Sequence, residues 1–320
     1  MSQERSDQQG TVGVWPSLPL TEWKDTYDTL HMWTQVVGKV ALAQAPMINH
    51  WWHATLHVTA RGISTPPLPH GNMVFQIEFD FIDHRLNIEA SDGSRRSIGL
   101  HRLSVADFYA EVMDTLSSFG LGVKVWPVPV EVESRIPCNL DREHASYNPE
   151  YAHRFWLILL QSDRVFREFR SRFIGKVSPV QFFWGSFDLA VTRFSGRRAP
   201  AYSGGAFNVA RGVMEEAYSH EVSSLGFWPG GGSIPYPVYY SYASPQPAGF
   251  AEARVLPESA FYSKDLGEFI LPYDDVRRAG NPEEMLLEFA QTSYDAAADL
   301  GRWDRASLER GDVQGGGGGS

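Results

Sequence analysis

Apolar residues recur at helical spacing in four long segments, and each segment follows a residue that commonly caps a helix. The spacing and caps predict helices that begin at Thr21, Ser104, Asn148 and Asn281. A proline, which suits the first helical turn, directly follows Asn148 and Asn281. An acidic residue stands three positions after Ser104 and Asn281, as in a capping box. We therefore expect four well-defined helix starts.

Between these helices, apolar and polar residues alternate with the period of two that indicates half-buried strands. The expected strands are 51–61, 75–81, 86–89, one that ends near 100, a proline-rich strand at 125–132, and 182–193, 222–227, 238–242 and 269–271. Turn signals such as Asp92-Gly93 join neighbouring strands as hairpins. The sequence thus predicts an α+β fold of antiparallel sheets with flanking helices.

The order helix, strands, helix occurs twice along the chain. We expect a first half at 15–132, a bridge at 133–147 and a second half at 148–310 that packs on the first and shares a sheet with it. An internal duplication and a chance recurrence of a common arrangement are equally good explanations. Residues 1–14 are polar and expected to be disordered, and 311–320 form a tail that ends in a Gly/Ser linker.

Composition narrows the class of protein. The net charge is −10 and basic residues form no long run, which disfavours nucleic-acid binding. No apolar stretch approaches the roughly 20 residues of a membrane span, so we expect a soluble protein without a membrane partner. Cys138 is the only cysteine, which excludes an intrachain disulfide and favours a reducing, cytoplasmic location. We expect this thiol to be buried or inert.

Polar and aromatic residues gather on the strand face that helices are expected to leave open. Helix spacing adds a polar stripe that contains His31, beside Trp33. The candidate acid–base groups are His53, Asp80, Asp188 and His220, and the candidate ligand-binding residues are His31, Trp33, Trp51, Trp184 and Arg193. The pattern favours an enzyme, of hydrolytic or metal-assisted chemistry, or a small-molecule-binding protein.

Several alternatives stay open. His50 and His53 would point to opposite faces of a strand, so any metal needs ligands from elsewhere, and neither metal nor cofactor can be named. Ser186 lacks the G-x-S-x-G context of a catalytic nucleophile. The open face could also be an ordinary hydrated sheet surface. As another alternative, its aromatic residues would form a protein-protein interface or a homo-oligomer contact, without catalysis.

Several long strings carry a resemblance: NHWWH from Asn49, FFWGSFDLAVTRFSGRRAP from Phe182, GFWPGGG from Gly226 and YDAAADLGRWDR from Tyr294. With others between Trp15 and Arg310, they resemble an uncharacterised bacterial family catalogued only as a domain of unknown function, family 5996. The resemblance implies a soluble bacterial protein without an assigned activity, so no catalytic residue can be transferred from it.

Overall fold

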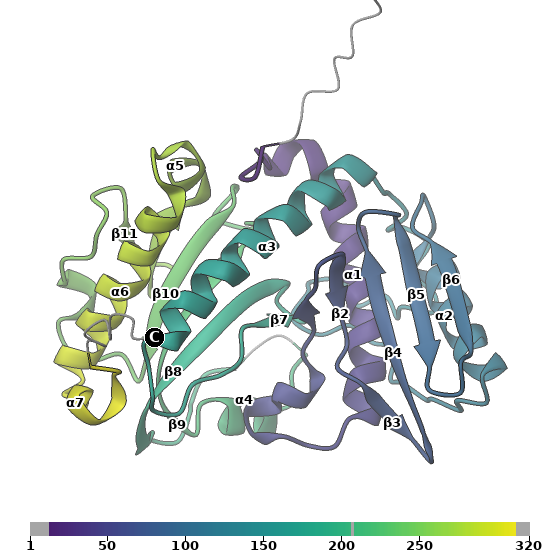
Figure 1. Cartoon of the computed structure of the whole chain (residues 1–320), viewed down its shortest axis with the longest axis horizontal. Coiled ribbons are helices and arrows are strands. Elements are labelled where there is room, and N and C mark those ends of the chain that lie inside the picture. Colours follow the sequence, from purple (N-terminus) through teal and green to yellow (C-terminus); the bar gives the residue numbers. More distant parts are fainter. Residues whose placement is uncertain (1–12, 206–207, 312–320) are drawn as a thin grey trace, which may run out of the picture.

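The computed structural model describes residues 13–205 and 208–311, and these form two antiparallel sheets with helices packed on their apolar faces (Figure 1). The predicted α+β class is confirmed. Residues 1–12 and 312–320, on which most of the predictions for the chain ends fall, lie outside the described residues.

Three of the four long helices begin where the sequence predicts. The side chains of Ser104, Asn148 and Asn281 accept backbone hydrogen bonds at the starts of α2, α3 and α6. The first helix, α1, begins one residue before Thr21 and has no side-chain cap. The helices and helical turns are α1 Leu20–Gln44, η1 Asn49–Ala54, α2 Val105–Ser118, α3 Pro149–Ser171, α4 Arg211–Ala217, η2 Phe250–Glu252, α5 Tyr273–Arg278, α6 Pro282–Leu300 and α7 Arg305–Leu308.

The first half forms one six-stranded sheet. Its strands are β1 His57–Val58, β2 Gly62–Ser64, β3 Leu68–His70, β4 Met73–Asp80, β5 Arg85–Ala90 and β6 Arg95–Gly99. They follow the order β1-β2-β4-β5-β6, and β3 also pairs with β4. The alternation predicted for β4 is confirmed: Phe75, Ile77 and Phe79 are buried on one face, and Phe79 stacks on Phe108 of α2.

The second half forms another six-stranded sheet. Its strands are β7 Gln181–Phe183, β8 Asp188–Arg198, β9 His220–Trp228, β10 Val238–Ser244, β11 Phe261–Ser263 and β12 Glu268–Pro272. Their order is β11-β12-β10-β9-β8-β7. Figure 1 shows α3, α5 and α6 lying across one face of this sheet. Both halves have a long helix, six strands and a closing helix, and the second half adds α4, η2 and α5. Strand order differs: β2 pairs with β4 in the first sheet, whereas β8 pairs with β9 in the second, where β12 lies between β10 and β11. A duplication stays a prediction.

Four sequence predictions are wrong here. Residues 51–54 form part of the helical turn η1, in which His50 and Trp51 adopt left-handed backbone angles, so the strand begins only at His57. The expected strand 182–193 is a hairpin of β7 and β8, and 125–132 contains no strand. The halves do not share a sheet; between the two described sheets, one isolated backbone bridge joins Leu56 and Phe182.

Helix α1 is buried between the two sheets along most of its length. Trp33 packs against α2 of the first half, with its ring centroid 4.8 Å from that of Phe108. On another side, Gly38 lies so close to Trp184 that a Cβ atom there would come within 2.3 Å of the indole. Consequently α1 is the common core element of both halves. No helix within the described ranges combines the length and apolarity that crossing a membrane requires.

Candidate functional site

Helices α3, α5 and α6 cover one face of the second sheet, and the helical turn η1 approaches the opposite face at Phe194. Tyr239 points to the helical side, where its hydroxyl and that of Ser162 in α3 lie 2.9 Å apart. Because side chains alternate along a strand, Tyr240 and Tyr242 lie on the opposite face. Strand register places Ala190 of β8 and Gly226 of β9 beside Tyr240 on that face. Asp188, two residues before Ala190, therefore belongs to the same open face.

Asp188 is the centre of this face. Its side chain accepts hydrogen bonds from the hydroxyl groups of Ser186 and Tyr240. Only 6% of the residue is exposed, and burial raises the pKa of its carboxyl group although the two hydrogen bonds oppose the shift. The second sheet thus holds an aspartate that binds its proton more tightly than an ordinary surface aspartate.

Two further carboxyl groups flank Asp188. Glu268 begins β12 and is half-buried, and burial together with the charge of Asp188 raises its pKa to about 7. Glu131 as a whole residue is exposed, but its carboxyl group is surrounded by protein. This burial, together with the charge of Asp188, raises the pKa of Glu131 to about 7 as well. Within residues 13–205 and 208–311, neither glutamate forms an ion pair or a side-chain hydrogen bond. We call Asp188, Glu131 and Glu268 with Ser186, Tyr218, Tyr240 and Tyr242 the Asp188 cluster.

Tyrosines line the same face. The rings of Tyr240 and Tyr242 are nearly parallel, with centroids 6.1 Å apart. The hydroxyl of Tyr242 lies 3.0 Å from that of Tyr218, whose ring stacks on Tyr202 at 4.4 Å. Gly226 permits this arrangement, because a Cβ atom there would lie 2.3 Å from the Tyr240 ring. The aromatic row gives the cluster flat surfaces next to its carboxyl groups.

A strained turn positions Asp188. Residues 184–187 connect β7 to β8, and the Phe187 amide donates to the Phe183 carbonyl at 2.8 Å. Phe187 has a left-handed φ of 60°, which is costly for a bulky residue. Its buried ring packs against Tyr27, Phe155 and His31, with centroids 4.9 to 5.1 Å apart, and this packing holds the backbone in place.

Polar side chains of α1 bind the two loops that carry Ser186 and Glu131. His31 Nε2 donates to the Gly185 carbonyl at 2.8 Å, and burial lowers the pKa of His31 to about 4, so the ring is neutral. Gln35 binds the Val130 backbone twice, donating to its carbonyl at 2.8 Å and accepting from its amide at 3.1 Å. Glu131 follows directly with a left-handed φ of 58°. A Cβ on Gly185 would meet the Glu131 carboxyl at 2.4 Å, so the two loops touch.

The structure brings only some of the predicted site residues together. Asp188 lies in the cluster and His31 supports it from α1. Trp184 is a buried anchor of the same turn, with its indole nitrogen donating to the Ala54 carbonyl at 2.7 Å. Trp33 lies in the core between α1 and α2, so it cannot line this face. Arg193 points to the helical side of β8 and is 1% exposed.

The expected meeting of the four acid–base candidates does not occur. Asp80 ends β4 in the first sheet, where it pairs with Arg61 at 2.6 Å and accepts from the amides of Ile82 and Asp83. Although burial opposes them, these bonds lower the pKa of Asp80. They make Asp80 a turn and ion-pair residue.

His53 and His220 also lie away from Asp188. His53 sits in η1 and accepts from the Ile48 amide at 3.3 Å; burial lowers its pKa. The strand face on which it was expected beside Trp51 does not exist there. His220 is the first residue of β9, whereas Leu189, the neighbour of Asp188, pairs with Phe227 near the other end of that strand. The seven residues from His220 to Phe227 correspond to roughly 23 Å of strand. Ser186, His220 and Asp188 have the residue types of a catalytic triad, but the distant His220 means that they do not form one.

No group of three His, Cys, Asp or Glu side chains in the described ranges has an arrangement that could hold a metal ion. Cys138 is buried, and burial raises the pKa of its thiol to about 11, in agreement with the expectation of an inert cysteine.

Sequence reasoning missed several cluster members. Tyr240 and Tyr242 alternate in a segment predicted as a strand, and their spacing of two on a polar face was the available signal. Glu131 lies in an irregular loop and Glu268 at a strand end, where no periodic pattern indicates a shared site. Their convergence depends on tertiary contacts.

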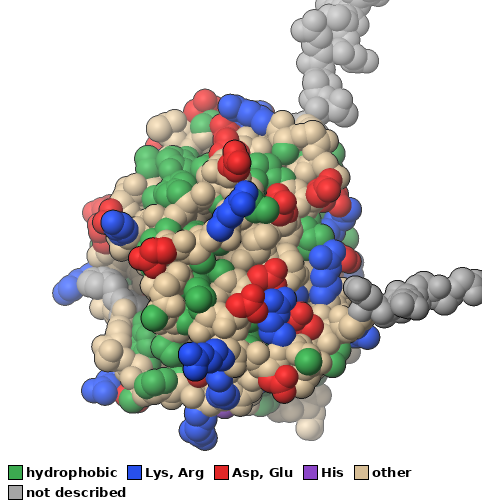
Figure 2. All heavy atoms as spheres, turned by 90° about the vertical axis from the view of Figure 1, so that its left-hand side faces the viewer, with side chains coloured by type: hydrophobic (Ala, Val, Ile, Leu, Met, Phe, Trp, Pro, Cys, Tyr) green, Lys and Arg blue, Asp and Glu red, His purple; other side chains and the backbone are tan. Residues whose placement is uncertain are grey.

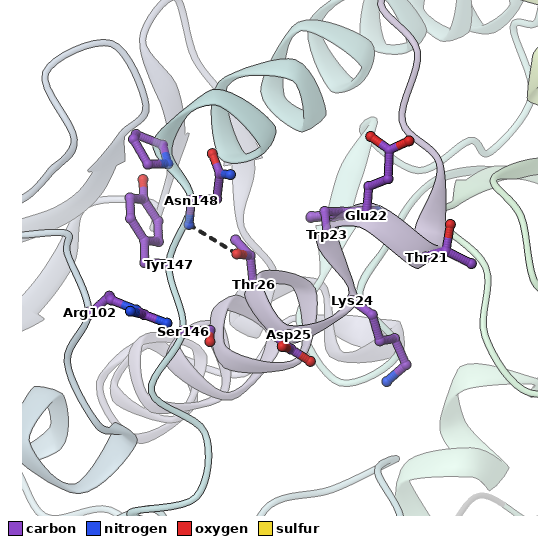
Figure 3. Close-up of a pocket in the computed structure, with 11 residues that line it drawn as sticks. Thr21, Glu22, Trp23, Lys24, Asp25, Thr26, Arg102, Ser146, Tyr147 and Asn148 are labelled. Atoms are coloured by element: carbon purple, nitrogen blue, oxygen red, sulfur yellow. Dashed lines mark hydrogen bonds between the residues drawn. The ribbon is translucent and has the colours of Figure 1, made fainter.

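A separate pocket of about 490 Å³ lies where α1 begins next to the cap of α3 (Figure 3). The Asn148 amide donates to Thr26 Oγ1 at 3.0 Å and closes one wall. Arg102 lies beside Tyr147 and Ser146, and Lys24 and Glu22 point away from each other. None of the predicted site residues lines this pocket.

Comparison with known proteins gives one match. Neither curated proteins nor solved structures contain a protein similar to this chain. A family model, described as a family of unknown function (DUF5996), matches residues 15–310 and thus nearly the whole described chain, which confirms the resemblance of the sequence strings. The chain belongs to the DUF5996 family.

Proposed function

We propose that the protein is an enzyme, or a small-molecule-binding protein, whose ligand binds at the Asp188 cluster. The observation that carries this proposal is a buried aspartate held by Ser186 and Tyr240 and flanked by two carboxyl groups that have no ion-pair partner among the described residues. Burying an acid among other acids costs free energy, and such an arrangement is common where pKa values are tuned for function.

General acid–base chemistry suits these groups. Glu131 and Glu268, each with a pKa of about 7, are present in both protonation states near neutral pH. A protonated carboxyl can donate to a leaving group while an ionised one accepts a proton from water, which is the requirement of hydrolysis. The three acids repel an anion, so the expected ligand is a neutral or cationic polar molecule that stacks on Tyr240 and Tyr242.

Loss of ligand binding in Asp188→Asn tests the proposal. A thermal-shift screen against uncharged sugars and small amines should give compounds that stabilise the natural protein and fail to stabilise this variant. Asp92→Asn, which alters an exposed turn of the first half, is the matched control and should keep every response. Compounds that stabilise Asp188→Asn equally would contradict the proposal.

Native mass spectrometry of the same sample distinguishes the alternative function. A homo-oligomer without a retained small molecule, with the mass unchanged in Asp188→Asn, would favour an interaction module that uses the aromatic face. A cytoplasmic location remains part of the proposal and rests on the single cysteine.

A further inference from the structure

A second pocket, of about 480 Å³, lies on the other side of the second sheet from Asp188. It is bordered by the end of α3, by β8, by α6 and by the chain after α7. Three of its lining residues are the arginines Arg172, Arg193 and Arg310. Figure 2, which views the molecule from the side of α5 and α6, shows acidic and basic side chains interspersed over this face, so the outer surface has no continuous patch of one sign.

Arg193 is the unusual member of this group. It is 1% exposed, and its guanidinium lies between aromatic rings, 3.5 Å from the Phe169 centroid and 4.3 Å from that of Tyr294. One Nη donates to the Phe169 carbonyl, whereas Nε is buried and has no hydrogen-bond partner. Within the described ranges no carboxylate lies within ion-pair distance of Arg193. The charges of Glu309 and Asp295 act on Arg193 only from beyond ion-pair distance. A buried cation without an ion-pair partner among the described residues is costly, so the position favours an anionic ligand.

The charged residues around Arg193 do not supply that anionic partner. Glu309, the pocket's carboxylate, is already bound by Arg305 and by the Tyr294 hydroxyl. Arg172 pairs with Glu168, and Arg310 donates through Nε to the Ser171 carbonyl but forms no ion pair within the described residues. Two or three guanidinium groups around one pocket form the usual environment of a tetrahedral oxyanion.

We propose that this pocket binds a phosphate group, with Arg193 as the buried contact and Arg310 and Arg172 at the rim. The phosphate belongs either to inorganic phosphate or to a small phosphate ester. The site lies on the opposite sheet face from the Asp188 cluster, because Asp188 and Arg193 are five residues apart in one strand. It is therefore independent of the proposed catalytic site.

Isothermal titration calorimetry of inorganic phosphate into the full chain, with sodium chloride adjusted to constant ionic strength, tests the proposal. We expect saturable binding with a Kd below about 1 mM. Tighter binding of glycerol phosphate would indicate an ester as the ligand, and equal binding would indicate phosphate itself. If titration of phosphate gives the same heats as titration of sodium chloride, the proposal is overturned.

Variants locate the site. Arg310→Gln should weaken phosphate binding by about tenfold, and Arg172→Gln with Arg310→Gln should weaken it further. Arg193→Met should abolish binding; if this variant does not fold, the two rim variants still decide. Arg278→Gln, an exposed residue of α5 paired with Asp274, and Asp188→Asn should both bind like the natural protein. Unchanged affinity in the rim double variant would contradict the proposed site.

Discussion

The acidic residues around Asp80 and those around Asp188 have opposite surroundings. In the first sheet, Asp80 is bound by Arg61 and two backbone amides, and Glu78 accepts from Thr59 at 2.7 Å. In the Asp188 cluster, Glu131 of a neighbouring loop and Glu268 of the second sheet have no such partners in the described ranges, and Asp188 accepts from hydroxyl groups. The hydrogen bonds lower the pKa of Asp80, whereas burial raises that of Asp188.

This difference separates carboxylates that stabilise the fold from carboxyl groups that we propose to act on a ligand. Satisfied carboxylates at strand ends fix turns and register, and their removal should cost stability. Carboxyl groups held in an acidic, tyrosine-lined surrounding contribute little to folding, so another role is the simpler explanation for them.

Gly62→Ala should be the most destabilising change. A Cβ at Gly62 in β2 would lie 1.7 Å from the backbone carbonyl oxygen of Phe79, so the pairing of β2 with β4 would have to open. We expect a loss of more than about 3 kcal/mol in the free energy of unfolding. Urea denaturation measures it, with Gly122→Ala, which meets no atom within 4 Å, as the control. Equal midpoints for both variants would contradict the packing.

Asp80→Asn and Asp188→Asn should change stability in opposite directions. Loss of the Asp80 charge weakens the Arg61 pair, and we expect a cost of about 1 to 3 kcal/mol at neutral pH. Asn at 188 removes a charge that burial disfavours, so the melting temperature should stay the same or rise. Differential scanning calorimetry compares the two, and a large loss in Asp188→Asn would show that this residue is structural.

Gly226→Ala should have a smaller effect on folding than Gly62→Ala and a larger one on the cluster. The new Cβ would meet a side chain, the Tyr240 ring, which can move. Its movement breaks the hydrogen bond to Asp188, at an expected cost of about 1 to 2 kcal/mol. Tyr240→Phe removes the same bond without the clash. Any ligand from the thermal-shift screen should bind more weakly to both variants, and a loss confined to Gly226→Ala would exclude a role for the hydroxyl.

The sequence predicted the fold class, three helix starts at Ser104, Asn148 and Asn281, and the alternation of β4, because these depend on local spacing and caps. It predicted a continuous strand through Trp184 because WGSF contains no strong turn signal beyond one glycine. Phe187 adopts its left-handed angle only because aromatic side chains from other elements hold its ring. Local propensity cannot register such a contact.

The same limit applies to the site. Asp188 was a candidate because of its place on the polar side of a strand, but Glu131 reaches it through the contact with Gly185 and the hold of Gln35 on Val130. His53 and Asp80 had suitable chemistry but lie in the first half, outside the second sheet. His220 lies in the second sheet, at the far end of the strand next to Asp188. Residue type indicated which groups could act, and tertiary structure decided which of them meet.

The smallest expected effect is a pH-dependent one at Glu268. Its folded pKa of about 7 exceeds the ordinary 4.5, so between these values the folded state holds a proton that the unfolded chain has lost. This contribution to stability is complete below about pH 4.5 and is lost as pH rises through about 7.

Glu268→Gln removes this pH dependence. Its melting temperature relative to the natural protein should therefore rise from about pH 5 to about pH 8. Glu258→Gln, an exposed residue outside the cluster, is the control. Parallel curves for Glu268→Gln and the natural protein would mean that Glu268 ionises as it does in the unfolded chain. The contrast between the Asp80 surroundings and the Asp188 cluster would then rest on Asp188 and Glu131 alone.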